Sequence, residues 1–453
     1  MTTAALVHQP NLPPAPTLPT WNPLGHMLGF RSDPLGLFER ARDVGDVVRL
    51  RVGWMSIYAA YAPEHAQHVL VDRSANYTKQ SRGYQRLRSF LGDGLLTAEG
   101  ELWRTQRRIA QPAFRHDKLA GFASGMVQAA EDMVAGWQAD TVVDVAEAMN
   151  RLTLRIAGET LLGLDLTGEA EEVGQALSDV LGGFIKGVTL PIVDYLPLPS
   201  TIRYRRGLAT LDRVVREIIA RRRADGSSHD DLLGMFMDAR DAQTGLGMSD
   251  DQLRDEVLTM LLAGHETTAN ALAFTLMCLA QHPEVAAKVA AEARAVQGPL
   301  GVGSLGQLGY IDQVLRESMR LYPPVWVESR RATEADVIGG VPIPAGGYVF
   351  LSQFAIQRHP RYWSSPLEFR PERWAEPALC PDGSPRPRHA WFPFGLGGRK
   401  CIGEHFAMME AKLVLAVMAR SFGFALLPGQ VVELEPSVTL RPRGGLGLRV
   451  LAV

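Results

Sequence analysis

Cysteine is scarce in this sequence, with only Cys278, Cys380 and Cys401 among 453 residues. Their number is odd, and their spacing matches neither a zinc finger nor an iron–sulfur cluster. A disulfide framework and a metal centre built from several cysteines are therefore excluded. So few cysteines are typical of a protein from a reducing compartment, and we expect a cytoplasmic location.

An excess of positive charge is also lacking, because 47 basic residues are balanced by 49 acidic ones for a net charge of −2. No basic block stands out along the chain. The sequence therefore predicts no binding of nucleic acid, which requires a basic surface. It also contains no convincing dinucleotide fingerprint, so we expect no flavin or nicotinamide module within these residues.

The first 20 residues contain no basic segment followed by an apolar run, so neither a signal peptide nor a membrane anchor is predicted. Proline instead punctuates residues 10–23, which is typical of an extended segment. No later stretch has the composition of a linker between domains. We predict a lead-in over residues 1–25 and a single domain over residues 26–453, because 46% apolar residues suffice for one large core.

One of the cysteines lies in a glycine-rich stretch with a distinctive spacing. Alone, a cysteine in a loop is more often a small buried residue than a ligand. Here the pattern F-x-x-G-x-R-x-C-x-G is met at Phe394, Gly397, Arg399, Cys401 and Gly403. Glycines allow backbone N–H groups to approach the sulfur, and a helix that starts near Gly403 would place its positive end beside it. The pattern therefore indicates a site for a thiolate.

On this motif the chain resembles the cytochrome P-450 family of haem-thiolate monooxygenases, and it looks like a soluble, bacterial-type member. The resemblance implies that Cys401 binds the iron of haem b, that Phe394 covers the sulfur, and that Arg399 pairs with a haem propionate. It also implies a mainly α fold with small β-sheets in one domain. In that fold the haem lies between a long central helix and the helix that follows the cysteine loop.

A long helix is predicted over residues 249–281. Ser249 and Gln252 fit a capping box at its start, and the apolar pattern continues to Gln281. Although its middle is apolar enough for a membrane span, Glu266 and Asn270 lie near the centre, where a bilayer would penalise them. We therefore expect a buried central helix.

The centre of this helix reads Ala263-Gly264-His265-Glu266-Thr267-Thr268. Taken alone, the sequence is a polar interruption of a core helix, in which glycine and threonine are unfavourable. The resemblance implies more specific roles: Gly264 leaves room for dioxygen, Thr267 hydrogen-bonds it, and Glu266 helps to deliver protons. We treat His265 as a polar neighbour rather than a ligand.

Other basic residues are candidates to bind the haem carboxylates. Trp103 and Arg107 lie four residues apart on a helical pattern over residues 102–115, and therefore on one face. Alone, this is a common surface pairing. The resemblance implies that both residues, together with Arg330, contact the propionates; Arg331 remains an alternative to Arg330.

Glu317 and Arg320 lie three residues apart on a predicted helix over residues 311–321. Such a pair is usually exposed to solvent. The resemblance implies that both residues form a buried charge network with Arg373, which would hold the cysteine loop in a purely structural role.

Further helices are predicted over residues 118–137, 145–164, 169–186 and 201–224, and the resemblance places some of them over a substrate pocket. Residues 47–61 are expected to form a hairpin, and residues 77–100 an irregular pocket wall. Ordinary core packing remains the alternative for each residue proposed to line the pocket. These candidates are Phe184, Ile192, Tyr195, Met260, Ala263, Val325, Val327 and Leu440.

The resemblance implies that the protein activates dioxygen and hydroxylates or epoxidises an apolar molecule such as a fatty acid, terpenoid or polyketide. Electrons would come from NAD(P)H through a separate ferredoxin or flavodoxin with its reductase, and the protein would be a monomer. The alternatives are a peroxide-driven hydroxylase, a haem-thiolate isomerase, or a non-catalytic haem-binding sensor. A basic patch for the redox partner is expected at Arg104, Arg108, Lys118, Lys400 and Lys412.

Overall fold

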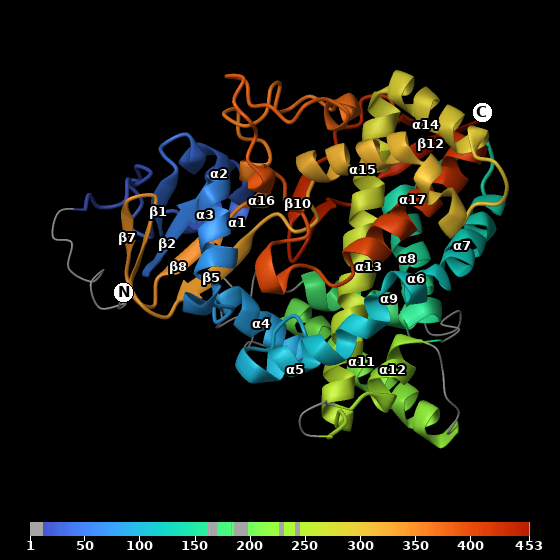
Figure 1. The fold of residues 1–453 in the computed structure, drawn as a ribbon, viewed down its shortest axis with the longest axis horizontal. Coiled ribbons are helices and arrows are strands. Elements are labelled where there is room, and N and C mark those ends of the chain that lie inside the picture. Colours follow the sequence, from blue (N-terminus) through green and yellow to red (C-terminus); the bar gives the residue numbers. More distant parts are fainter. Residues whose placement is uncertain are drawn as a thin grey trace.

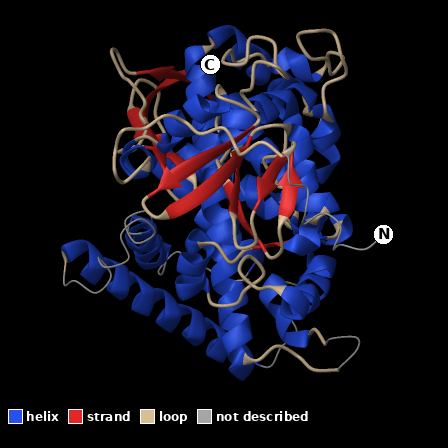
Figure 2. Ribbon diagram, turned by 90° about the vertical axis from the view of Figure 1, so that its left-hand side faces the viewer, coloured by secondary structure: helices blue, strands red, loops and turns tan. Residues whose placement is uncertain are grey.

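Helices make up most of the molecule, and the largest of its small sheets lies to one side of them (Figures 1 and 2). The structure is a computed structural model that describes residues 12–161, 163, 170–182, 184, 198–225, 231–240 and 245–452. The predicted mainly α fold with small β-sheets is thus confirmed.

The helices are α1 (Met27–Ser32), α2 (Pro34–Arg42), α3 (Pro63–Gln67), α4 (Arg82–Leu91), α5 (Gly100–Ala110), α6 (His116–Ala120), α7 (Ala123–Ala135), α8 (Val145–Leu161), α9 (Ala170–Gly182), α11 (Pro199–Asp225), α12 (Leu232–Asp238), α13 (Asp250–Gln281), α14 (Pro283–Ala295), α15 (Gly309–Leu321), α16 (Gln353–Ile356) and α17 (Glu404–Ser421).

The strands are β1 (Val47–Val52), β2 (Met55–Ala60), β3 (Tyr77–Thr78), β4 (Val142–Asp144), β5 (Glu328–Ala332), β6 (Asp336–Ile338), β7 (Val341–Ile343), β8 (Tyr348–Leu351), β9 (Phe422–Leu426), β10 (Leu434–Pro436), β11 (Leu440–Pro442) and β12 (Gly447–Ala452).

Helix α13 runs through the middle of the molecule and packs against α8, α11, α15 and α17 (Figure 1). It has 32 residues, as the sequence predicts, and both hydrogen bonds of its capping box form. Ser249 accepts from the Gln252 N–H at 3.3 Å, and the Gln252 side chain accepts from the Ser249 N–H at 3.0 Å. Among the described residues, no helix is long and apolar enough to cross a bilayer.

The largest sheet has five strands in the order β1-β2-β8-β5-β3. The predicted hairpin is present: β1 and β2 pair antiparallel, with Val52 opposite Met55. Gly53 sits in the turn with a φ of +62°, a conformation that favours glycine. Because β8 pairs with β2 in parallel and with β5 antiparallel, β5 lies one strand away from the N-terminal hairpin. Its residues Glu328 and Ser329 border the cavity described below.

Two predicted segments differ from the structure. The stretch 77–100 is not wholly irregular, because it contains α4, which begins after the capping residue Ser81 and buries Leu87, Phe90 and Leu91. The helix predicted over residues 102–115 ends at Ala110, and a 3-10 turn over 111–114 follows. Pro112 explains this end, since a proline cannot donate the next helical hydrogen bond.

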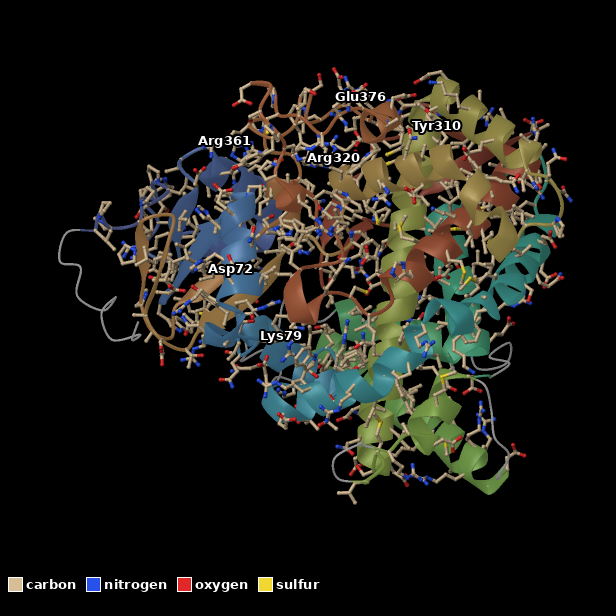
Figure 3. The ribbon with its side chains drawn as sticks, in the orientation of Figure 1. Asp72, Lys79, Tyr310, Arg320, Arg361 and Glu376 are labelled. Atoms are coloured by element: carbon tan, nitrogen blue, oxygen red, sulfur yellow. The ribbon has the colours of Figure 1, made fainter. Side chains whose placement is uncertain are left out.

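The charge network of Glu317, Arg320 and Arg373 is buried and fully formed. Glu317 and Arg320 are 0% exposed, and Arg373 is 2% exposed. Glu317 pairs with Arg320 at 2.8 Å and with Arg373 at 2.9 Å, and it accepts the Trp374 indole N–H at 3.1 Å. The remaining guanidinium N–H groups donate to backbone carbonyls of residues 357–368. The network therefore ties α15 to the loop that leads into the cysteine motif (Arg320 in Figure 3).

Two neighbouring carboxyls of α13, of which that of Glu256 is buried, bind the turn over residues 92–95. Asp255 accepts the Asp93 N–H at 2.7 Å, and Glu256 accepts the Leu95 N–H at 3.0 Å. A Cβ on Gly94 would lie 2.2 Å from the Thr259 hydroxyl, so only glycine permits this approach. Burial, opposed by the Leu95 N–H and reinforced by Asp255, raises the pKa of Glu256 from its ordinary value of 4.5 to about 8.

Replacement of Arg373 by leucine should destabilise the protein by about 3–5 kcal/mol, because it leaves the Glu317 carboxylate buried with one cation fewer. Urea unfolding measures the change. Arg443→Leu is the matched control: Arg443 pairs with Glu433 at 2.9 Å, but both side chains are more than half exposed, so its loss should cost less than about 1 kcal/mol. Equal effects of the two substitutions would contradict a structural role for the network.

Glu256→Gln should flatten the dependence of stability on pH. Since the pKa of Glu256 is raised in the folded state, the stability it contributes is complete below pH 4.5 and is lost as the pH rises through about 8. The wild type should therefore lose a few kcal/mol more than the variant between pH 5 and pH 9. Urea unfolding across this range tests it, with exposed Glu433→Gln as the control; parallel curves for wild type and Glu256→Gln would refute it.

Candidate active site

A cavity of about 410 Å³ lies between the middle of α13, the cysteine loop and the five-stranded sheet. Cys401, Phe394 and Gly403 line one side, and Gly264, Glu266 and Thr267 of α13 also line it. The motif around Cys401 and the motif in α13 are more than 130 residues apart in the sequence. The fold brings both to one enclosed space, and its size suits a cofactor or a small molecule.

The cysteine loop is shaped by its own backbone and by a distant segment. The Cys401 N–H donates to the Phe394 carbonyl at 2.8 Å, and residues 397–399 form a short 3-10 turn. Gly397 has a φ of +68°, and a Cβ there would lie 2.2 Å from the Leu70 carbonyl oxygen. Glycine is therefore required at position 397 by the Leu70 backbone, whereas Gly403 lies beside the sulfur, which its Cβ would approach to 4.0 Å.

Several groups act on the ionisation of the Cys401 thiol. Cys401 is exposed to the cavity, but it lies deep within the protein. This position raises the pKa of the thiol, whereas the Gly403 N–H and then the guanidinium of Arg107 lower it. Helix α17 begins at Glu404, directly after the sulfur-bearing residue and its glycine. In the protein alone burial prevails, in contrast to the expectation from the helix terminus. A metal ion at this position would reverse the balance, since a coordinating thiol loses its proton.

Helix α13 presents a small, polar strip to the cavity. Ala263, Gly264 and Thr267 line it, and the Thr267 hydroxyl donates to the Ala263 carbonyl at 2.7 Å. Glu266 is 4% exposed, and burial raises the pKa of its carboxyl, opposed by a hydrogen bond from Thr439. A carboxyl with a raised pKa thus precedes an alcohol in the cavity wall, which is a combination that can hold and transfer protons.

His265 faces away from this strip. It is buried, it is not part of the cavity lining, and its backbone carbonyl accepts the Thr153 hydroxyl of α8 at 3.1 Å. Burial lowers the pKa of its imidazole to about 4. The ring is therefore neutral at physiological pH.

A group of buried cations lies at one edge of the cavity. The Arg399 guanidinium stacks 4.0 Å from the centroid of the Trp103 ring, donates to the Ala98 carbonyl at 2.7 Å and pairs with Glu99 at 3.3 Å. Arg330 is 4% exposed and pairs with Glu328 at 2.8 Å; it lies behind Glu328 and Ser329, which line the cavity, and does not itself line it.

Lys79 is the member of this group that sequence reasoning missed (Figure 3). It lines the cavity, is 8% exposed, and donates to the Leu96 carbonyl at 2.9 Å. Burial, followed by repulsion from Arg330 and Arg399, lowers the pKa of its ammonium to about 7. Three cations with only two nearby carboxylates leave this edge of the cavity suited to additional negative charge.

The other predicted cofactor contacts lie behind this edge. Arg107 donates to the Lys400 carbonyl at 3.0 Å, next to the cysteine, and Trp103 backs Arg399 rather than lining the cavity. Of the two neighbouring arginines, Arg330 joins the buried cations. Arg331 instead lies over the Tyr348 ring at 5.9 Å.

Most of the predicted pocket residues line the cavity, namely Phe184, Met260, Ala263, Val325 and Val327. Leu440 does not: it is 0% exposed in the core, and the preceding residues Ser437, Val438 and Thr439 line the cavity instead. The candidates Ile192 and Tyr195 lie outside the described residues.

A further carboxyl near the site was not predicted. Glu410 of α17 is 0% exposed, and burial, opposed by the nearby Thr268, raises its pKa well above 4.5. Neither of its oxygens meets a donor in good hydrogen-bond geometry among the described residues. The signal in the sequence is a single acid between Met409 and Ala411 on an otherwise apolar helix face.

The predicted basic patch is largely paired with neighbouring acids. Arg104 pairs with Glu101 at 3.0 Å, Lys400 pairs with Glu404, and Lys412 pairs with Asp312 at 2.7 Å. Lys412 is also mostly buried, with 18% of its side chain exposed. The patch is therefore less positive than the sequence suggests.

Comparison with known proteins places these features in a family. The family model described as Cytochrome P450 matches residues 13–446. The solved structure of the cytochrome P450DA heme domain superposes with a TM-score of 0.86 at 29% identity, over 98% of both chains.

Two relatives come from Streptomyces. Cyclooctat-9-en-7-ol 5-monooxygenase of Streptomyces melanosporofaciens is 34% identical over 90% of this chain and 88% of its own. Pentalenene oxygenase of Streptomyces avermitilis is 33% identical over 92% of this chain and 91% of its own. The chain belongs to the cytochrome P450 family of haem-thiolate monooxygenases, oxidoreductases that insert one oxygen atom into apolar small molecules.

Proposed function

We propose that the cavity holds haem b and that Cys401 is the protein ligand of its iron. The observation that carries this proposal is the placement of one thiol on the cavity wall while Lys79, Arg330 and Arg399 gather at an edge. A thiol suits the iron, and the cations suit the two carboxylates of the porphyrin. Trp103 and Arg107 support this edge from behind. When bound, the haem supplies the activation of dioxygen.

The chain's own residues then divide the remaining tasks. Gly264 keeps α13 free of a side chain beside the cavity, and the Thr267 hydroxyl stands ready to donate a hydrogen bond there. Glu266, whose pKa is raised by burial, is the neighbouring group that would hold and release a proton. Phe394 and the apolar lining exclude water and orient an apolar substrate.

For the substrate, we propose a cyclic terpenoid. The cavity wall above α13 is formed by apolar side chains such as Phe184, Met260, Val325 and Val327. Two of the relatives named above act, by their names, on cyclooctat-9-en-7-ol and pentalenene. A rigid ring system loses little conformational freedom on binding, which suits a site with few polar contacts.

For the electron supply, we propose NAD(P)H as the source and a ferredoxin or flavodoxin with its reductase as the carrier. Arg104, Lys400 and Lys412 are paired with carboxylates of this chain, so electrostatic steering should be weak. Docking would then depend on shape and apolar contact more than on charge.

Replacement of Cys401 by serine should abolish the spectral signature of thiolate ligation. The CO difference spectrum of the reduced protein measures it, since the strongly red-shifted Soret band requires a thiolate opposite CO. Cys278→Ser is the control, because Cys278 is buried in α13 away from the cavity lining. If the band persisted in Cys401→Ser, the proposed ligand would be wrong.

Removal of the Thr267 hydroxyl should uncouple electron use from product formation. In Thr267→Val we expect the product formed per NAD(P)H to fall at least tenfold, because positioned proton donors contribute about 10²–10⁴ in rate. The matched control is Thr275→Val, two turns along α13, where the buried hydroxyl makes the same bond to the carbonyl four residues back at 2.7 Å. Equal coupling in both variants would exclude a role for Thr267.

The substrate class is tested by titration of the holoprotein and measurement of the haem spin state. Cyclic terpene hydrocarbons and their mono-alcohols should bind at least ten times more tightly than straight-chain fatty acids with the same number of carbons. Dependence of product on NAD(P)H and carrier proteins, rather than on added peroxide, separates the proposed reaction from a peroxide-driven one. Tighter binding of the fatty acids would overturn the terpenoid proposal.

A further inference from the structure

Three buried polar side chains meet beside the cavity, on elements far apart in the sequence. Glu266 and Asn270 lie four residues apart on α13, and therefore on one face of the helix. Thr439 lies between β10 and β11, and like Glu266 it lines the cavity. Glu266 and Thr439 are 4% exposed and Asn270 is 2% exposed. Groups buried to this degree require hydrogen-bond partners, so their arrangement is constrained.

The direction of the hydrogen bonds follows from the donors available. The Asn270 amide nitrogen donates to the Thr439 hydroxyl oxygen at 3.1 Å. An amide NH₂ group can only donate, so the hydroxyl accepts here, and its own hydrogen is directed elsewhere. Thr439 also hydrogen-bonds the Glu266 carboxyl. The hydroxyl hydrogen therefore points to Glu266, and the chain of donors runs from Asn270 through Thr439 to the acid.

The turn that carries Thr439 is held in place from several sides. The Ser437 N–H donates to the Thr439 carbonyl at 2.9 Å, and the Leu440 N–H donates to the Pro324 carbonyl at 2.8 Å. The Trp326 indole N–H donates to the Ser437 carbonyl at 3.0 Å. These bonds fix the backbone on both sides of Thr439, so its hydroxyl is a rigid partner for the acid.

The Oε2 atom of Glu266 is buried and has no hydrogen-bond partner among the described residues. We propose that Asn270 and Thr439 are positioning residues, which hold the Glu266 carboxyl in place in the cavity wall. The inference rests on the proton-handling role proposed for Glu266, and it adds the two residues that set the orientation and acidity of this group.

Charged residues of both signs near Glu266 also act on the pKa of its carboxyl. Arg441 lowers its pKa and Glu435 raises it, and these two residues pair with each other at 3.2 Å across β10 and β11. On α13 itself, His265 is neutral at physiological pH, because burial lowers its pKa to about 4. Since the charged pair is largely self-compensating, the hydrogen bond from Thr439 is the main specific interaction that favours ionisation of the acid.

The test compares carboxyl stretching bands in infrared difference spectra, recorded on photolysis of the CO complex of the holoprotein between pH 5 and pH 9. Glu266→Gln should remove one band and thereby assign it. Thr439→Val should move that band to a higher wavenumber and raise the pH at which it disappears, because the carboxyl has lost its donor. Thr439→Ser should restore the wild-type position, and Asn270→Leu should split or broaden the band as the hydroxyl becomes free to rotate.

Val438→Ala is the matched control, because it alters the neighbouring part of the cavity wall without removing a polar group. A Glu266 band that stays in place in Thr439→Val, or that moves equally in Val438→Ala, would overturn the inference, as would the lack of any band removed by Glu266→Gln.

The amount of product formed per NAD(P)H tests the proposed role of Glu266 separately from the role of Thr439. If product per NAD(P)H is unchanged in Glu266→Gln, the proton-handling role fails. The band shift in Thr439→Val still decides whether Thr439 holds the acid. If both roles are correct, the pH dependence of product formed per NAD(P)H should shift to higher pH in Thr439→Val and return to the wild-type position in Thr439→Ser.

Discussion

A carboxyl group removed from water must either meet a cation or keep its proton, and this constraint organises the interior of the protein. Both solutions occur around α13. Glu317 pairs with two arginines and joins α15 to the loop before the cysteine. Glu256, Glu266 and Glu410 lack such partners, and burial raises the pKa of each. The paired acid is structural, whereas Glu266, with its raised pKa, lies in the cavity wall.

Cations removed from water likewise need a partner of opposite charge, and this applies at the edge of the cavity. Lys79, Arg330 and Arg399 lie together near two carboxylates, and burial, followed by repulsion from the two arginines, lowers the pKa of Lys79 to about 7. Additional negative charge would therefore be favourable here. The two carboxylates of the proposed haem would supply it.

The sequence predicts those parts of the structure that are determined by residues close together along the chain. The capping box of α13, the hairpin around Gly53 and the cysteine motif are of this kind, and all have the predicted form. Helix α4 was missed because arginines interrupt its apolar residues Leu87, Phe90 and Leu91.

Lys79 and Glu410 were missed for another reason: each is an isolated polar residue, and its burial depends on elements that meet only in the folded chain. Leu440 was predicted to line the pocket, but it begins β11 and is buried in the core. Ser437, Val438 and Thr439, in the turn that precedes it, line the cavity.

Gly397 gives the cysteine loop an unexpected dependence on the far end of the chain. Its backbone lies against the Leu70 carbonyl so closely that no side chain fits between them. The position of the Cys401 loop is thus set partly by a segment more than 300 residues earlier in the sequence. If the ten-residue loop were transferred to another protein, the cysteine would be transferred with it, but the Leu70 backbone that positions the loop would not.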